Sequence, residues 1–205
     1  AIVMNMKLLL VGNYGVGNVG DEALKQYFLE RFPEVQWRVV SAHPAAGEYP
    51  RLPAGLRSLF QPWWRTLAAL RASDGVVLGG GSLFTDVESV YACFLWWWHV
   101  LLAWLCRKPV YAAFQGVGPL RTTLGRWLAR SALRKCASIS VRDSASHALA
   151  KSLLSNKKII QSFDPVLLLL ESQKSNESSK NVFIISPRHN STPLFRKRMQ
   201  EQGLQ

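Results

Sequence analysis

The sequence predicts an α/β fold built on a parallel, Rossmann-like sheet. Short apolar runs alternate with longer segments of helical periodicity, which is typical of strands joined by crossover helices. Most of the apolar runs end in a turn rich in glycine or polar residues, as expected where parallel strands reach a ligand-binding edge. With 205 residues, 48% of them hydrophobic, the chain can bury a sizeable core.

The predicted elements begin with an apolar run at residues 6–12. We expect this run to be a buried strand and not a secretory signal, because it is short and ends in a glycine turn. A helix is predicted over residues 20–32, where Leu24, Phe28 and Phe32 share one stripe. Further strands are predicted at residues 36–42, 74–82, 108–118, 137–143 and 158–165, and further helices at residues 123–136 and 145–154.

The apolar segment at residues 90–106 allows two interpretations. It is either a helix buried against the sheet or an interfacial helix whose tryptophans lie at a lipid headgroup boundary. A spanning helix needs about 20 apolar residues. This run is shorter, is interrupted by His99 and is followed at once by Arg107 and Lys108, so we do not expect it to cross a membrane.

The composition changes at residues 171–181, which are polar and rich in serine. We therefore expect an amino-terminal Rossmann-like domain over residues 1–170, a linker over 171–181, and the start of a second α/β domain over 182–205. One strand and a partial helix cannot bury a core of their own, so we expect the second domain to be truncated.

The charge and the cysteines restrict the partners and the compartment. A net charge of +12 favours a phosphorylated ligand or an anionic surface. Nucleic acid is not favoured, because the basic residues lack interleaved aromatic residues. The three cysteines are odd in number, sparse and without C-x-x-C spacing, which together indicate a reducing compartment and argue against a disulfide framework or a zinc site.

The first turn contains the pattern G-x-G-x-x-G at Gly15, Gly17 and Gly20. A dinucleotide site also needs an acidic residue about 20 positions further on, for the ribose. Ser41 and His43 stand there instead. A dinucleotide oxidoreductase is therefore the least favoured function.

Two acids, Asp21 and Glu22, follow these glycines in the first turn of the predicted helix. Together with Asn18 they either cap the helix, or one carboxylate faces the ligand and binds a hydroxyl or acts as a base.

Later turns offer further candidate ligand contacts. Gly80 and Gly81 allow close approach of the backbone to a ligand, Ser82 can cap, and Asp86 can accept a hydroxyl. Gln115 supplies an amide in the next turn, unless that turn is only a strand-to-helix connection.

Two arginines offer a planar fork for a carboxylate or phosphate. Arg142 ends a predicted strand, where the alternative is an ion pair with Asp143 or a helix cap by Asp143. Arg188 is similar in character but lies beyond the linker.

Five segments, in this order, resemble the polysaccharide pyruvyl transferase family, which includes the CsaB-like enzymes of bacterial cell-wall assembly. The resemblance covers residues 7–170 and extends to ISPR at 185–188. The segments are GNYGVGNVGDEAL, DGVVLGGGSLFTD, KPVYAAFQGVGPL, SISVRDSASHALA and FDPVLLL.

This resemblance implies that the chain is the amino-terminal half of a GT-B-like, two-domain fold with the active site between the domains. Members transfer the pyruvyl group of phosphoenolpyruvate onto two hydroxyls of a sugar and form a cyclic ketal, a scheme that needs no metal and no organic cofactor. For CsaB-like members the implied acceptor is a lipid-linked saccharide. We therefore expect a cytoplasmic protein at the inner face of the cell membrane.

The implied chemistry suggests roles for the candidate residues. Arg142 and Arg188 would bind the two anionic groups of phosphoenolpyruvate, and Asp21 or Asp86 would orient or deprotonate the sugar hydroxyls. The resemblance places the histidine that acts as general acid in the second domain. We therefore expect this chain alone to have little or no turnover. The expected catalytic residues are Asp21, Asp86 and Arg142, and the expected substrate-binding residues are Gly15, Asn18, Gly80, Gly81, Ser82, Gln115 and Arg188.

Two alternatives remain at this point. One is a glycosyltransferase domain of the GT-B type, which shares the architecture and a phosphate-rich donor. The other is a sugar- or membrane-binding module without turnover.

Overall fold

The computed structural model describes residues 6–168. Their seven strands are all parallel and form one sheet in the order β3-β2-β1-β4-β5-β6-β7. The strands are β1 (Lys7–Val11), β2 (Gln36–Ser41), β3 (Tyr49–Pro50), β4 (Gly75–Phe84), β5 (Val110–Val117), β6 (Ser138–Val141) and β7 (Ile160–Gln161). The helices are α1 (Val19–Arg31), α2 (Trp63–Arg71), α3 (Val90–Leu105), α4 (Thr123–Lys135) and α5 (Ser144–Leu153), with a 3₁₀ helix η1 (Leu56–Phe60). The expected α/β, Rossmann-like fold class is confirmed.

The direction of the strand order reverses between β1 and β4. The chain first proceeds from β1 to β2 and β3 on one side, and then returns to β4 and continues to β7 on the other. Both central strands are apolar, because a parallel strand is covered on both faces. Leu9, Leu10 and Val11 of β1 pair with Val76, Val77 and Leu78 of β4, and all six are buried.

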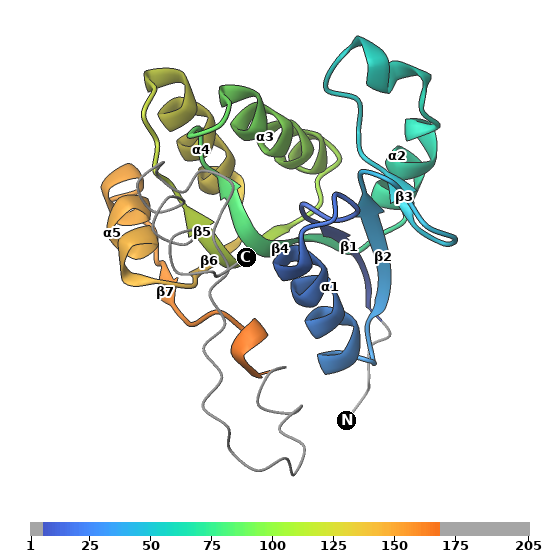
Figure 1. Cartoon of the computed structure of the whole chain (residues 1–205), viewed down its shortest axis with the longest axis horizontal. Helices are drawn as coiled ribbons and strands as arrows, with labels where there is room; N and C mark the ends of the chain where they lie inside the picture. Colours follow the sequence, from blue (N-terminus) through green and yellow to red (C-terminus); the bar gives the residue numbers. More distant parts are fainter. Residues whose placement is uncertain (1–5, 169–205) are drawn as a thin grey trace, which may run out of the picture. The chain divides into compact units, whose positions relative to one another are not determined.

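Helices cover both faces of the sheet (Figure 1). On one face, Tyr27 and Phe28 of α1 pack with Leu8, Leu10 and Val77. On the other face, side chains of α2, α3, α4 and α5 contribute to a larger apolar cluster with the sheet. The residues that connect strands and helices therefore gather at the two edges of the sheet.

The structure adds elements that the sequence pattern does not predict. The short strand β3, η1 and α2 all lie between residues 49 and 71. The strand expected at 158–165 is only two residues long, Ile160–Gln161. The linker at 171–181 and the second domain at 182–205 lie outside the described residues, so these boundaries stay predictions.

The apolar segment at 90–106 forms α3, which packs on the sheet through Cys93, Trp96 and Val100. Within residues 6–168, no helix is long and apolar enough to cross a membrane.

Candidate functional site

The candidate site lies at the carboxyl edge of the sheet, around the reversal point between β1 and β4. In open parallel sheets this is where ligands bind. Asn13 and Asp21 follow β1, Arg51 follows β3, Ser82 belongs to the glycine turn of β4, and Arg142 follows β6. Residues that are far apart in the sequence thus meet at one edge.

Asp21 is the buried acid of this group. It lies in the first turn of α1 and is only 8% exposed. Its Oδ2 accepts a hydrogen bond of 3.0 Å from Asn13 Nδ2. Burial raises the pKa of the Asp21 carboxyl, although the Asn13 hydrogen bond and the charges of Arg142 and Arg51 act in the opposite direction.

The backbone of Gly81 passes directly beside Asp21. A Cβ at Gly81 would come within 2.6 Å of Asp21 Oδ1, and the residue has a φ of +76°. Both the space and the conformation therefore require glycine here. Gly80, with a φ of +81°, packs instead against the Leu24 side chain of α1.

Arg51 is a site residue that the sequence analysis does not identify. Its Nη2 donates a 3.0 Å hydrogen bond to Asn13 Oδ1, and its guanidinium lies 5.0 Å from the ring centroid of Trp96 in α3. Its Nε is buried and has no partner among the described residues. Arg51 follows a two-residue strand without an apolar run, so periodicity gives no signal for it.

Arg142 connects three strand ends. Its Nη2 donates to Ser82 Oγ at 3.0 Å, and its Nη1 donates to Asp164 Oδ2 at 3.1 Å. A Cβ at Gly116 would lie 3.2 Å from Arg142 Nε, so the backbone of β5 approaches the guanidinium closely. Both alternative roles of Asp143 are present as well. Its Oδ1 accepts from Ser146 N and caps α5. Its Oδ2 lies 3.7 Å from Arg142 Nε and forms an ion pair with it.

The glycine loop after β1 is closed by the protein's own side chains. Gly15 N donates to Glu22 Oε1 at 2.6 Å, and Lys25 Nζ lies 2.6 Å from Glu22 Oε2. Burial alone would raise the pKa of Glu22, but the bonds from Lys25 and Gly15 N lower it. Glu22 thus uses a backbone amide that a bound pyrophosphate would need.

Asn18 acts as the N-cap of α1, because its side chain accepts from Gly20 N at 3.0 Å. Such a cap contributes about 1 kcal/mol. The capping interpretation therefore holds for Asn18, and a contact between Asn18 and substrate stays a prediction.

Asp86 holds the loop that leads into α4. Its oxygens accept from Arg121 N at 2.6 Å, from Thr122 N at 2.7 Å and from Thr122 Oγ1 at 2.6 Å. Burial would raise the pKa of Asp86, but these hydrogen bonds lower it. Asp86 shares no hydrogen bond or ion pair with Asp21 or Arg142 in the described part of the chain, so we leave it out of the reaction proposed below.

Gln115 is fully buried beneath the site. Its Nε2 donates to the carbonyls of Leu78 and Ala113 at 2.9 and 3.1 Å, which ties β4 to β5 at the glycine turn. Its Oε1 has no partner among the described residues. Arg188, the remaining expected residue, lies outside residues 6–168.

Metal-binding side chains do not cluster here. Over the described range, no group of three or more His, Cys, Asp or Glu residues could hold a metal ion. The arrangement instead brings two arginines near a buried carboxyl, since the charges of both lower its pKa. Such a site can bind an anion with two charged ends and accept a proton between them.

Comparisons with known proteins identify a family for this chain. The family model for polysaccharide pyruvyl transferase matches residues 18–202. The chain is similar to the amylovoran biosynthesis protein AmsJ of Erwinia amylovora, with 24% identity over 208 residues that cover 80% of this chain and 49% of AmsJ. The chain thus spans about half the length of this curated relative.

A solved structure shows the same fold. The chain is similar to Alr3699/HepE of Anabaena, crystallised in complex with UDP, with a TM-score of 0.50 and 11% identity. The similarity covers 76% of this chain and 44% of that one. It supports the Rossmann-like fold class, and the partial coverage agrees with one half of a GT-B-like, two-domain fold.

Proposed function

Because the chain belongs to the polysaccharide pyruvyl transferase family, we propose that the protein transfers a pyruvyl group from phosphoenolpyruvate to a saccharide during polysaccharide biosynthesis. The observation that supports this most directly is that Arg51 and Arg142 both lie close enough to the Asp21 carboxyl for their charges to lower its pKa, and that Arg51 is joined to Asp21 through Asn13. Phosphoenolpyruvate carries a phosphate and a carboxylate, and two arginine forks suit these two groups.

In the proposed complex, Arg142 binds one anionic group of the donor. Ser82 and Asp164 hold its guanidinium in place. Arg51 binds the other group, and its stacking on Trp96 keeps it near the site.

Asp21 acts in this scheme as the base for the acceptor. The first sugar hydroxyl adds to C2 of the donor and passes its proton to the Asp21 carboxylate, while a general acid protonates the methylene carbon. The second hydroxyl then attacks C2 and closes the cyclic ketal, while the C2–O bond to phosphate breaks and the departing phosphate takes the proton of that hydroxyl. Burial suits Asp21 to this role, because a raised pKa makes the carboxylate a better proton acceptor.

The finer assignments belong to the same proposal. The acceptor is a saccharide of a cell-wall or exopolysaccharide precursor, carried on a lipid, and the protein works in the cytoplasm at the inner face of the membrane. Arg188 and the histidine acid would come from the second domain. The low turnover expected for this chain alone stays a prediction.

A second candidate is a glycosyltransferase, because the structural relative from Anabaena was solved with UDP.

An assay of donor use tests the proposal against this second candidate. The full-length gene product should release phosphate from phosphoenolpyruvate only when an acceptor saccharide is present. Mass spectrometry should show the acceptor gaining the mass of one pyruvyl ketal. Release of UDP from a UDP-sugar, with no phosphate from phosphoenolpyruvate, would instead support the glycosyltransferase.

A further inference from the structure

Helix α3 is apolar on all sides, yet within residues 6–168 part of its outer side stays exposed. It contains no Asp, Glu, Lys or Arg over its 16 residues. A helix of this kind is normally buried all round, by protein or by lipid. Here Tyr91, Trp104 and Leu105 are 52%, 53% and 58% exposed.

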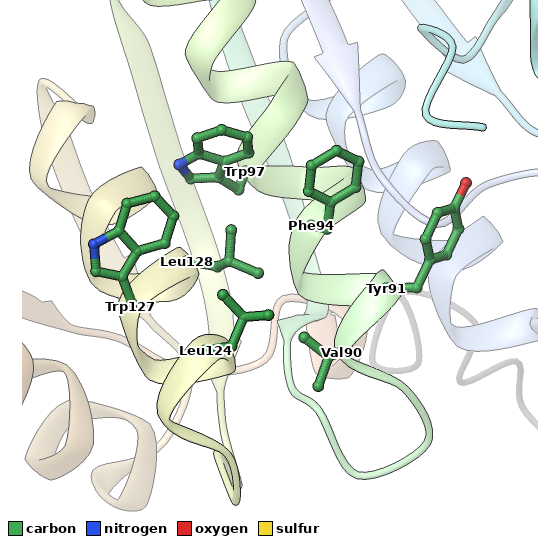
Figure 2. A pocket seen from close by; sticks show the side chains of 7 residues that line it. All are labelled: Val90, Tyr91, Phe94, Trp97, Leu124, Trp127 and Leu128. Atoms are coloured by element: carbon green, nitrogen blue, oxygen red, sulfur yellow. The ribbon is translucent and has the colours of Figure 1, made fainter.

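An apolar groove runs between α3 and α4. Figure 2 shows side chains of the two helices lining it, with Trp97 of α3 and Trp127 of α4 on facing sides, their ring centroids 5.8 Å apart. Its volume is about 350 Å³. Leu124 and Trp127 of α4 are 55% and 56% exposed, so large apolar side chains of the groove are in contact with solvent.

The same part of the chain is strongly basic. Residues 89–142 contain eight Lys or Arg residues and no Asp or Glu. Arg126, Arg130 and Arg134 of α4 are exposed, and none of them forms an ion pair in the described part of the chain. Their spacing of four residues puts them on one stripe of the helix, next to Trp127.

We propose that this α3–α4 surface, the groove together with the arginine stripe, docks on the face of an anionic lipid bilayer. Tryptophan and leucine beside arginine is the pattern of segments that lie in the membrane interface. The arginines would contact headgroup phosphates, and Leu124 and Trp127 would enter the acyl boundary.

Charge argues against a second copy of the chain as the occupant. Pairing this surface with itself would bring two acid-free, basic stripes together, and like charges repel. A bilayer with anionic lipids supplies both the apolar depth and the opposite charge.

The location of the surface gives it a functional consequence, and this step rests on the proposed function. The first turns of α3 and α4 follow β4 and β5 and line one end of the groove with Val90, Tyr91 and Leu124. That end is at the same edge of the sheet as Asp21 and Arg142. Docking would bring the site to the membrane face, where a lipid-linked saccharide is held.

Co-sedimentation of the 205-residue chain with vesicles tests the proposal. The chain should pellet with vesicles of phosphatidylcholine and phosphatidylglycerol, and much less with phosphatidylcholine alone, and high salt should release it. Replacing Arg126, Arg130 and Arg134 by Gln should weaken binding roughly five-fold per arginine, or on the order of 100-fold in all. Leu124→Ser combined with Trp127→Ser should also weaken it at least ten-fold.

Matched controls remove equal charge or apolar area elsewhere. The charge control replaces Lys7, Arg31 and Arg71, which are exposed on other elements, by Gln. The apolar control replaces Leu59 and Phe60, 51% and 91% exposed, by Ser. Both should bind vesicles like the parent chain, and melting curves should show that every variant is folded.

Three results would overturn the proposal. The first is a loss of vesicle binding in the control variants equal to that in the test variants. The second is vesicle binding that does not depend on the anionic lipid. The third is a Leu124/Trp127 variant whose only change is conversion of a dimer to a monomer in light scattering. Vesicle binding needs no donor or acceptor. Transfer without docking would therefore contradict only this inference, and docking without transfer would contradict only the proposed function.

Discussion

Asp21 is a buried carboxyl whose charged form is poorly stabilised by its surroundings. It is 8% exposed and accepts one hydrogen bond from Asn13, but it has no ion pair within 4 Å in the described residues. A carboxylate in this setting costs stability, because the charged form has lost part of its hydration. Sites that perform proton transfer often carry such a cost.

Asp21→Asn should therefore stabilise the fold while removing activity. A raised folded-state pKa means that the acid favours folding most below its unfolded pKa and loses this contribution as the pH rises through the folded pKa. The advantage of the variant in melting temperature should thus be small near pH 4 and grow towards pH 8. An effect of about 1 kcal/mol corresponds to about 2–4 °C for a chain of this size. Pyruvyl transfer by the full-length gene product should fall by about 10²-fold or more.

Glu34→Gln provides the control, because Glu34 is an exposed acid without a hydrogen bond in the described structure. Its melting temperature should follow the parent at every pH. An Asp21→Asn variant that melts below the parent at pH 8 would mean that the carboxylate is favourably paired rather than penalised by burial.

At the scale of the elements, His99 fixes α3 to the segment that carries Arg51. Leu52 N donates to His99 Nε2 at 3.1 Å, so the ring proton is on Nδ1, which donates to Leu95 O at 2.8 Å. His99 is 2% exposed. Burial lowers its pKa to about 4, despite the opposing bond to Leu95. The neutral ring thus positions the loop in which Arg51 meets Asn13.

Acid should weaken this connection in a defined pH window. Because the folded pKa of His99 is depressed, its contribution is fully present above the unfolded pKa of about 6.5 and is lost as the pH falls towards about 4. Between pH 7.5 and 4.5 the parent should lose on the order of 2–3 kcal/mol of unfolding free energy more than His99→Gln does. Urea titrations at the two pH values measure the difference. His147→Gln, in α5, should lose as much as the parent, and an equal loss in His99→Gln would refute the role of this ring.

The predictability of an element follows from the length of its pattern. Apolar runs such as 74–82 and the amphipathic stretch 123–136 are long enough to show their period, and the structure contains both elements. The two-residue strand β3 has no period to detect. Arg51 stays hidden for the same reason, because its place at the site depends on tertiary contacts with Asn13 and Trp96.

Within the site, the sequence predicts the turns. It does not distinguish side chains that would contact a ligand from side chains that form hydrogen bonds within the protein. Arg142 and Ser82 are candidates that the structure brings together, at 3.0 Å. Gly15, Asn18 and Asp86 lie at turns of the same kind, but their hydrogen bonds close a loop or cap a helix. Only the fold shows which polar groups are already used.

At the scale of the whole molecule, the site joins the two halves of the sheet. Arg51 belongs to the side that contains β1, β2 and β3, and Arg142 belongs to the side that contains β4 to β7. Asp21 reaches across, because its carboxylate contacts Gly81 of β4. A ligand with two anionic groups that binds both arginines would connect these halves and oppose global unfolding.

Phosphoenolpyruvate should therefore raise the melting temperature of this chain. A ligand at 100 times its Kd adds about 2.7 kcal/mol, which corresponds to a shift on the order of 5–10 °C for a protein of this size. Arg51→Met and Arg142→Met should each remove most of the shift, since each leaves one anionic group unpaired. Inorganic phosphate or pyruvate alone should shift the melting temperature less than the intact donor, because each supplies one group only.

Arg31→Met, at the exposed end of α1, is the matched control and should respond to the donor like the parent. Differential scanning fluorimetry in a buffer free of phosphate measures all of these shifts. A donor-induced shift that survives in both Arg51→Met and Arg142→Met would contradict the two-arginine site. A shift with UDP but none with phosphoenolpyruvate would favour the glycosyltransferase, because the donor of that reaction carries UDP.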